Sequence, residues 1–367
     1  MKTKRKLPQK LWLSLAALVI LVGIVACCIL ATAKSGWIQQ DGITQYYADY
    51  RTPLTGWQGI EGKLYYFDPE TTALVTGWLE LDGIRYYLSS TGAVNPGLQT
   101  IDGNRYYLED DGAVCIGWKT LPEDTYYFLP DGTAASGWQK IDSKQYYFDS
   151  DGAMHLGWLD DGTDHYYFRE DGTMAVGEVV IDDFSYFFTS KGKHVELVNA
   201  WHLMPEDYTL DLVDIEDFLI DRSCKDALQQ MLNDCRAAGY GCWINNTYRS
   251  IETQQELWDE RMAMWMSQGA SYDEALALVG ESVAVPGGSE HNLGLAADIN
   301  GSEGVYDWLE ENCQEYGFIM RYPDEKKELT GIIYEPWHYR YVGTELAQEL
   351  TQLGLCMEEY MQMLTTN

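Results

Sequence analysis

Two short segments near the end of the 367-residue chain each contain a histidine and an acid. The first segment holds His291 and Asp298, and the second holds Glu335 and His338. Catalytic zinc typically takes three protein ligands from His, Asp, Glu or Cys and keeps a fourth position for water. Two imidazoles and one carboxylate would complete such a shell and leave one carboxylate over as a base. The pattern therefore predicts a site for one Zn²⁺ ion.

The chain must fold back within the first segment for this site to form. Seven fully extended residues would hold His291 and Asp298 about 23 Å apart, which is too far for a shared ion. Asn292-Leu293-Gly294 has the composition of a turn, and residues 295–299 have the pattern of a short buried strand that would carry Asp298. We therefore expect a turn followed by a strand.

The second segment needs an irregularity of a different kind. Glu335 and His338 are three residues apart, a spacing that would point them to opposite faces of a regular strand. Pro336 lacks an N–H and interrupts a strand ladder. We therefore expect a turn or bulge there, which lets both side chains face one point.

The two segments together resemble a known motif pair. S-x-H-x-x-G-x-A-x-D followed by E-x-x-H is similar to the pair found in the zinc D-alanyl-D-alanine carboxypeptidase family of the vancomycin-resistance type. The resemblance covers roughly residues 196–367, and its other matching segments are Leu197-Val198-Asn199, Pro205 to Tyr208, Tyr248-Arg249-Ser250, Tyr316-Gly317-Phe318, Arg321-Tyr322-Pro323 and Glu335 to Gly343.

This resemblance implies a role for each matching residue. His291, Asp298 and His338 would be the zinc ligands. Glu335 would be the general base, and Arg249 the cation that stabilises the developing oxyanion. Three further residues stand where family members line the substrate cleft: Ser250, Gln254 and Ser289.

The implied activity is removal of the terminal D-alanine from peptidoglycan stem pentapeptides. An L,D-carboxypeptidase or a peptidoglycan endopeptidase would use the same metal site with different cleft loops. A further alternative is a wall-binding adhesin or receptor in which the peptidase is secondary or inactive.

Helix and strand patterns in residues 196–367 predict an α+β domain with a small antiparallel sheet, as the resemblance also implies. The expected helices are residues 224–238, 251–268, 272–280 and 306–316, and the expected strands include 241–247, 332–334 and 339–342. The five cysteines of this region can form disulfides outside the cytosol, and buried free thiols are the alternative.

Residues 35–195 form an internal repeat. Eight glycines spaced 20 residues apart, with one step of 21, begin the units: Gly36, Gly56, Gly77, Gly97, Gly117, Gly137, Gly157 and Gly177. Most units continue with an aromatic residue, a turn signal such as Asp82-Gly83 and a Tyr pair, which is the pattern of a β-hairpin. Because one hairpin cannot bury its aromatic face, we expect the units to stack into an all-β solenoid.

This repeat resembles the choline-binding and glucan-binding repeats of Gram-positive surface proteins. In that family aromatic rings from adjacent hairpins surround a quaternary ammonium group. The tryptophans that could do so here are Trp37, Trp57, Trp78, Trp118, Trp138 and Trp158, whereas Leu98 and Glu178 replace the tryptophan in two units. The expected ligand is a wall glycan or a choline-bearing polymer, and the alternative is a spacer whose rings only form the core.

The N-terminal segment predicts attachment to a membrane. Residues 1–10 form a basic tail, expected to be cytoplasmic, and residues 11–33 carry no charge over a length that can span a bilayer. We expect a single-pass anchor, with the catalytic domain in the cell wall of a Gram-positive-type bacterium. Ile24-Val25-Ala26-Cys27 also resembles a lipoprotein cleavage box, which is the alternative.

The net charge of −32 makes nucleic acid an unfavourable partner. Taken together, the sequence predicts a multi-domain protein with a transmembrane helix, a hairpin-repeat solenoid and an α+β zinc peptidase domain.

Overall fold

The computed structural model describes residues 35–49, 52–206 and 208–366. The basic tail, the expected membrane anchor at 11–33 and Cys27 lie outside the described residues. Among the helices that the structure describes, none is long and apolar enough to cross a membrane. The chain divides into two compact units between His155 and Leu156, and each unit is described by itself below.

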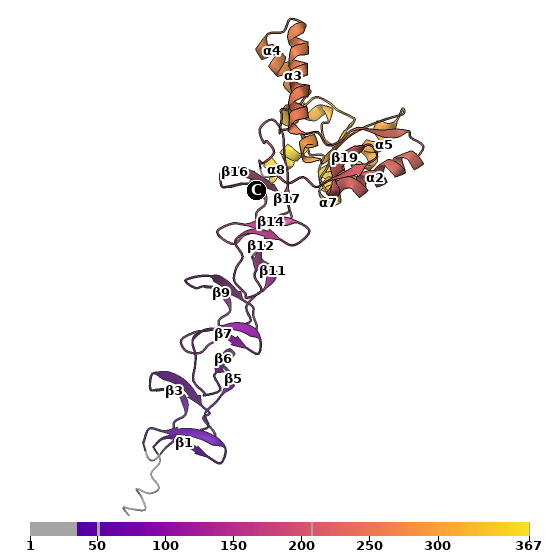
Figure 1. Cartoon of the computed structure of the whole chain (residues 1–367). Helices are drawn as coiled ribbons and strands as arrows, with labels where there is room; N and C mark the ends of the chain where they lie inside the picture. Colours follow the sequence, from indigo (N-terminus) through magenta and orange to yellow (C-terminus); the bar gives the residue numbers. More distant parts are fainter. Residues whose placement is uncertain (1–34, 50–51, 207, 367) are drawn as a thin grey trace, which may run out of the picture. The chain divides into compact units, whose positions relative to one another are not determined.

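The repeats form eight antiparallel hairpins within the described residues (Figure 1), as the spacing predicted. Six belong to the first unit: β1–β2 (Gly36–Gln40, Ile43–Tyr47), β3–β4 (Gly56–Ile60, Lys63–Phe67), β5–β6 (Gly77–Leu81, Ile84–Leu88), β7–β8 (Gly97–Ile101, Asn104–Leu108), β9–β10 (Gly117–Thr120, Thr125–Phe128) and β11–β12 (Gly137–Ile141, Lys144–Phe148). The second unit begins with β13–β14 (Gly157–Asp160, His165–Phe168) and the three-stranded β15–β16–β17 (Gly177–Ile181, Phe184–Phe188, His194–Val195).

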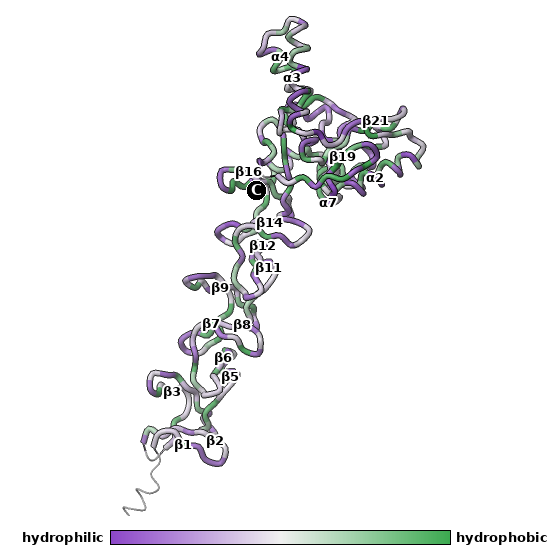
Figure 2. Tube along the Cα trace, viewed as in Figure 1, coloured by the Kyte–Doolittle hydropathy of each residue, from purple (hydrophilic) through white to green (hydrophobic). Residues whose placement is uncertain are grey.

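The hairpin tips follow from the turn dipeptides. Asp82 and Gly83 have φ angles of 51° and 78°, and two positive φ angles in succession are what a type I′ turn requires. Several of the hairpin loops are purple, and so hydrophilic, in Figure 2. Successive hairpins are joined by backbone hydrogen bonds, because the segment after one hairpin returns to the hairpin before it. Val94 N–H, for example, donates to Leu64 C=O at 2.9 Å.

The rest of the second unit is an α+β domain. A hairpin, β18–β19 (Leu212–Ile215, Phe218–Asp221), precedes a four-stranded antiparallel sheet in the order β20-β21-β23-β22. The sheet strands are β20 (Cys242–Asn246), β21 (Ala296–Gly301), β22 (Phe318–Met320) and β23 (His338–Tyr341). Helix α2 packs on the sheet through Leu228, Met231 and Leu232, which are fully buried.

The first three helices match the expected segments closely, whereas the last three were not predicted. They are α2 (Arg222–Ala237), α3 (Ile251–Ser267), α4 (Tyr272–Gly280), α5 (Val305–Asn312), α6 (Lys327–Thr330), α7 (Thr344–Leu353) and α8 (Met357–Thr366), with 3₁₀ turns η1 (Glu290–Leu293), η2 (Cys313–Tyr316) and η3 (Asp324–Lys326). The sequence treated residues 306–316 as one helix, whereas the structure has α5 followed by η2.

The expected strand at 332–334 is wrong. Its backbone bonds do not run along a partner strand, because Ile333 N–H donates to Glu281 C=O and Ile332 N–H donates to the Thr330 hydroxyl at 3.4 Å. The cysteines among the described residues are all free, and those of the α+β domain are buried.

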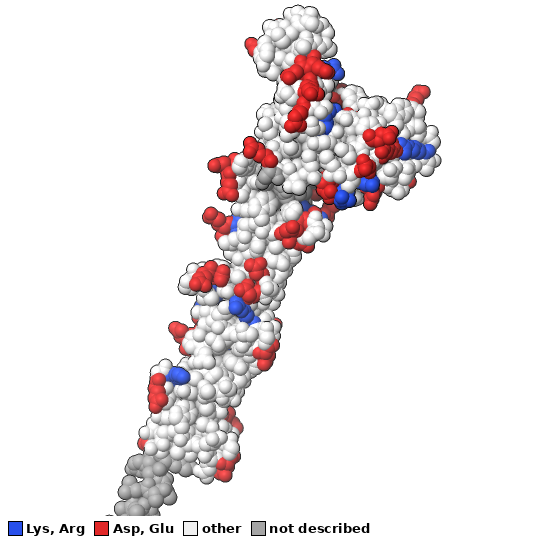
Figure 3. All heavy atoms as spheres, viewed as in Figure 1, with Lys and Arg blue, Asp and Glu red and all other residues white. Residues whose placement is uncertain are grey.

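Acidic side chains predominate over basic ones on the face shown in Figure 3.

The last hairpin belongs to the core of the second unit. Phe187 of β16 is buried in one cluster with Leu346 and Leu350 of α7 and with Tyr360 of α8. The Tyr360 hydroxyl accepts from Ser190 N–H at 3.0 Å. The last hairpin and the α+β domain are therefore joined by a packed core within this unit.

Candidate active site

Three side-chain atoms from two strands and a 3₁₀ turn converge on one point. Asp298 Oδ1 lies 3.4 Å from His291 Nε2 and 3.2 Å from His338 Nδ1. Four ligands at zinc distances of about 2.0–2.1 Å in a tetrahedron stand about 3.3 Å from one another. Asp298 Oδ1 is also buried and has no hydrogen-bond partner among the described residues. The three residues therefore fit a single zinc ion.

The elements that bring these residues together follow from the local sequence. Residues 290–293 form the 3₁₀ turn η1, and Gly294 ends it in the left-handed conformation with φ 72°. The chain then enters β21, where Asp298 stands directly opposite His338 of β23 in the antiparallel register. The turn expected at Asn292-Leu293-Gly294 and the strand that carries Asp298 are both present.

The second segment turns at Pro336, as expected. His338 N–H donates to Glu335 C=O at 3.1 Å, which closes the turn just before β23 begins. The Glu335 carboxylate consequently comes within 3.7 Å of His338 Nδ1. The turn thus places an acid beside the three converging atoms without making it part of their group.

Each imidazole has an acceptor oxygen near its other nitrogen. His291 Nδ1 lies 2.5 Å from the Thr247 carbonyl oxygen, and His338 Nε2 lies 3.5 Å from Glu290 Oε2. Such partners fix the tautomer and the ring orientation of metal-binding histidines. They leave His291 Nε2 and His338 Nδ1 directed at Asp298.

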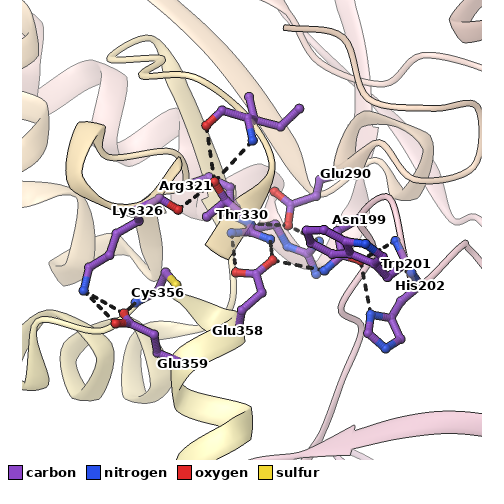
Figure 4. A network of polar contacts seen from close by, with 12 residues as sticks. Asn199, Trp201, His202, Glu290, Arg321, Lys326, Thr330, Cys356, Glu358 and Glu359 are labelled. Carbon is purple, nitrogen blue, oxygen red and sulfur yellow. Dashed lines mark hydrogen bonds and ion pairs between the residues drawn. The ribbon is translucent and has the colours of Figure 1, made fainter. Parts of the chain in front are cut away.

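Glu290 is itself held by a buried network of charges (Figure 4). Its side chain is fully buried, and its Oε1 accepts from Arg321 Nε at 2.7 Å and lies 3.4 Å from Arg340. Arg321 also binds the Glu358 carboxylate of α8 through both terminal nitrogens, and Asn199 donates to the same carboxylate. The network thus runs from the His338 ring to the C-terminal helix.

Burial and neighbouring charges shift the pKa values of these groups. Burial by itself would raise the pKa of Glu290, but Arg321 and Arg340 outweigh it and hold that pKa well below its usual range. Burial would also lower the pKa of His338, yet the surrounding carboxylates, chiefly Asp298 and Glu290, raise it to about 9. Coordination of a metal would release that proton, since only the neutral ring binds a metal.

Glu335 and Arg249 complete the site. Burial raises the pKa of Glu335 to about 7, and the charge of Asp298 adds to this effect, while His338 and Arg249 oppose it. Burial lowers the pKa of Arg249, which Asp298 and Glu335 partly offset. An acid with a pKa near neutrality, next to a half-buried cation, is suited to moving a proton and to stabilising a negative charge.

These groups line a cavity of about 210 Å³. Arg249, Gln254 and Ser289 lie in its wall together with His291, Asp298, Glu335 and His338, and the remaining lining residues include Arg261, Tyr322 and Trp337. The cavity therefore contains all of the expected site residues of this domain except Ser250.

Two of the residues expected to contact substrate have structural partners instead. Ser250 is the N-cap of α3, and its hydroxyl accepts from Thr253 N–H at 3.1 Å. The Gln254 amide accepts from Arg249 at 2.7 Å and donates to Ala284 C=O at 2.7 Å. Gln254 therefore holds the guanidinium in the cavity wall, whereas the structure gives Ser250 the role of a helix cap.

The sequence indicated no role for Glu290, Arg321, Arg340 or the Thr247 carbonyl, although both arginines stand in segments that carry the family resemblance. Glu290 precedes His291 directly, and its place within the motif is the only local signal it carries. The two arginines are distant in sequence and meet Glu290 only through the sheet and η1.

The expected repeat tryptophans take part in ring contacts between hairpins. Five of them contact a Tyr of their own hairpin and one of the next hairpin, namely Trp37, Trp57, Trp78, Trp118 and Trp158. Trp138 contacts Tyr147 of its own hairpin at 5.5 Å between ring centroids.

In this α+β domain, two histidines and an aspartate converge beside a buried glutamate. This arrangement is typical of domains that bind one catalytic metal ion. Comparison with known families specifies it further. Residues 217–344 match the D-alanyl-D-alanine carboxypeptidase family of the VanY type. Residues 135–176 match a choline-binding repeat, and residues 76–94 and 97–114 match a cell wall binding repeat. The chain thus carries a VanY-type carboxypeptidase domain preceded by choline-binding repeats, which confirms both resemblances.

Individual relatives agree with these matches. A D-alanyl-D-alanine carboxypeptidase of Enterococcus faecalis is 43% identical over 173 residues, which cover 45% of this chain and 64% of the relative. Another from Enterococcus faecium is 35% identical and covers 47% of this chain and 50% of the relative. The chain therefore spans less than two thirds of the length of either relative. A crystal structure of a vancomycin-resistance D,D-pentapeptidase VanY with Zn(II) is 42% identical, covers 45% of this chain and 97% of that one, and has a TM-score of 0.43.

Proposed function

We propose that the protein is a zinc carboxypeptidase of the bacterial cell wall that removes the C-terminal D-alanine from peptidoglycan stem pentapeptides. The observation that carries this proposal is the convergence of His291, Asp298 and His338, at separations of 3.2 and 3.4 Å, beside the Glu335 carboxylate. The names of the related enzymes supply the substrate.

In this proposal His291 Nε2, Asp298 and His338 Nδ1 hold the ion. When bound, zinc supplies a Lewis acid and lowers the pKa of water to about 7. Glu335 accepts a proton from the attacking water and passes one to the leaving amine of D-alanine. Arg249, held by Gln254, stabilises the negative charge that develops on the scissile carbonyl oxygen.

The remaining parts would keep the enzyme at its substrate. We propose that residues 11–33 anchor the chain in the membrane, with residues 34–367 outside the cell, and that the repeats bind a choline-bearing polymer or a glycan of the wall. Binding to an insoluble wall raises the effective concentration of the stem peptides at the catalytic domain.

The variant Glu335→Gln tests the catalytic part. We expect it to bind zinc with little change and to lose at least about 10²-fold in turnover, the usual contribution of a general base. Defined stem penta- and tetrapeptides should be incubated with the full chain, with and without a chelator, and the products weighed by mass spectrometry. Wild-type turnover by Glu335→Gln would refute the base, and cleavage of the tetrapeptide alone would identify an L,D-carboxypeptidase.

A further inference from the structure

The repeat hairpins build a series of three-ring cages. Each cage consists of the Trp after the first glycine of a hairpin, the Tyr that stands opposite it in the same hairpin and one Tyr of the next hairpin. In the Trp57 cage the Trp ring lies 5.0 Å from Tyr66 and 5.1 Å from Tyr86. Closely spaced aromatic faces attract cations, and quaternary ammonium groups are a common ligand of such cages.

The Trp78 cage already contains a cation from the chain itself. The guanidinium carbon of Arg85 lies 3.6 Å from the centroid of the Trp78 ring and 5.9 Å from that of Tyr106. Arg85 Nη1 also donates to the Asp131 carbonyl oxygen at 2.9 Å, two hairpins further along the chain. The guanidinium is therefore fixed at both sides, by a ring face and by a backbone acceptor.

The strand register explains why Arg85 reaches this ring. Trp78 pairs with Tyr87, and Arg85 is two residues before Tyr87, so all three side chains lie on one face of the hairpin. The corresponding position of the preceding hairpin is Leu64, which precedes Tyr66 by two residues. Among the described residues, no Lys or Arg lies over a ring of the Trp57 cage.

A second internal cation supports the preference of these rings for positive charge. Leu98 replaces the Trp in the hairpin after Trp78, and there Lys119 Nζ lies 4.2 Å from the centroid of the Tyr107 ring. The same ammonium binds Glu109 at 2.7 Å. Two neighbouring junctions between hairpins thus carry a cation of the chain against an aromatic face.

We propose that Arg85 is an internal ligand that occupies the Trp78 cage, so that an external organic cation binds the Trp57 cage and not the Trp78 cage. This inference rests on the proposed wall-binding function of the repeats. It divides their cages into open ones, which an external cation can enter, and occupied ones, which already hold a cationic side chain of the protein. A tethered guanidinium competes at a high effective concentration. Choline should therefore bind the Trp78 cage at least about tenfold more weakly than the Trp57 cage.

The test uses the detergent-solubilised full chain labelled with 5-fluorotryptophan and observed by ¹⁹F NMR. The variants Trp57→Phe and Trp78→Phe assign the two resonances, and choline chloride is the probe. We expect choline to shift the Trp57 resonance with saturation while the Trp78 resonance stays in place. In Arg85→Gln the Trp78 resonance should respond as well, whereas in the matched control Leu64→Gln it should not.

A response of Trp78 equal to that of Trp57 in the unchanged chain would overturn the inference. A second readout needs no ligand. Loss of the guanidinium should shift the Trp78 resonance, and it should expose the ring, so that a neutral soluble paramagnetic agent broadens this resonance more strongly. An Arg85→Gln variant without this change also overturns the inference. If choline moves neither resonance in any variant, choline is excluded as the wall ligand, and the ligand-free readout still decides whether Arg85 fills the cage.

Discussion

Glu290 connects a metal-site imidazole to two buried guanidinium groups. Its Oε2 faces His338 Nε2, while Oε1 faces Arg321 and Arg340. A carboxylate in this position keeps the proton of a bound histidine on the nitrogen away from the metal. Glu290 is thus a positioning residue, and the two arginines are what make its buried charge stable.

We predict that Glu290→Gln weakens zinc binding about 10- to 100-fold, the usual cost of removing such a partner. Competition with a chromophoric chelator measures this affinity, and circular dichroism checks the fold. The control is Glu358→Gln, which removes the other acidic partner of Arg321 without touching His338. Both changes should lower stability, because each leaves a buried guanidinium less well compensated. An equal loss of zinc affinity in the two variants would contradict the positioning role.

At the scale of single residues, the sequence indicated the candidate ligands but not the side chains that hold them in place. His291, Asp298, Glu335 and His338 were recognisable because their types and spacings belong to two compact motifs. The contact of Glu290 with Arg321 joins residues 31 positions apart, one in η1 and the other directly after β22. No local periodicity encodes such a pair, since it arises only when the sheet has formed.

The turn between His291 and Asp298 depends on Gly294. Its φ of 72° is strained for any residue with a side chain, and a Cβ there would meet Leu212 Cδ2 at 3.0 Å and Asp221 N at 3.1 Å. The close backbone approach explains why the turn is sensitive to size as well as to conformation. Gly354, at the end of α7, has a similar φ of 66° but open space around it.

We predict that Gly294→Ala destabilises the domain more than Gly354→Ala does. The control should lose about 1–2 kcal/mol from the left-handed conformation alone, whereas Gly294→Ala adds crowding and moves η1, which carries His291. Thermal unfolding measures the first effect, and zinc affinity measures the second. Zinc affinity should fall only in Gly294→Ala, and equal behaviour of the two variants would show that the crowding has no consequence.

Elements with a local signal were the predictable ones. The hairpins follow from dipeptides such as Asp82-Gly83, which select their own turn, and α4 begins with the capping box of Ser271 and Glu274. Residues 332–334 looked like a strand because of their apolar and aromatic side chains. They do not form one, because their N–H groups bond to the Glu281 carbonyl and to the Thr330 hydroxyl rather than to a neighbouring strand.

On the scale of the whole chain, the end of the sequence repeat and the boundary between the compact units lie at different residues. The repeat pattern ends near residue 195, but the compact units divide between His155 and Leu156. The hairpin β15–β16 contacts the C-terminal helix through Glu178 N–H, which donates to Thr365 Oγ1 at 2.8 Å, and through Ser190. A repeat pattern shows which positions of successive units are equivalent. It does not show which other elements those residues pack against.

This difference predicts how the catalytic domain should be isolated. A fragment of residues 156–367 keeps Phe187 in its cluster with Leu346 and Tyr360, whereas a fragment of residues 196–367 exposes that surface. Burial of one such aromatic side chain contributes about 1.5–3 kcal/mol. Since about 1 kcal/mol changes the melting temperature of a domain of this size by about 2–4 °C, the shorter fragment should melt about 3–12 °C lower. Calorimetry of both fragments, with zinc present at equal saturation, measures the difference. The variant Phe187→Ala in the longer fragment should reproduce a large part of it, and equal melting temperatures would show that the last hairpin adds nothing to the stability of the catalytic domain.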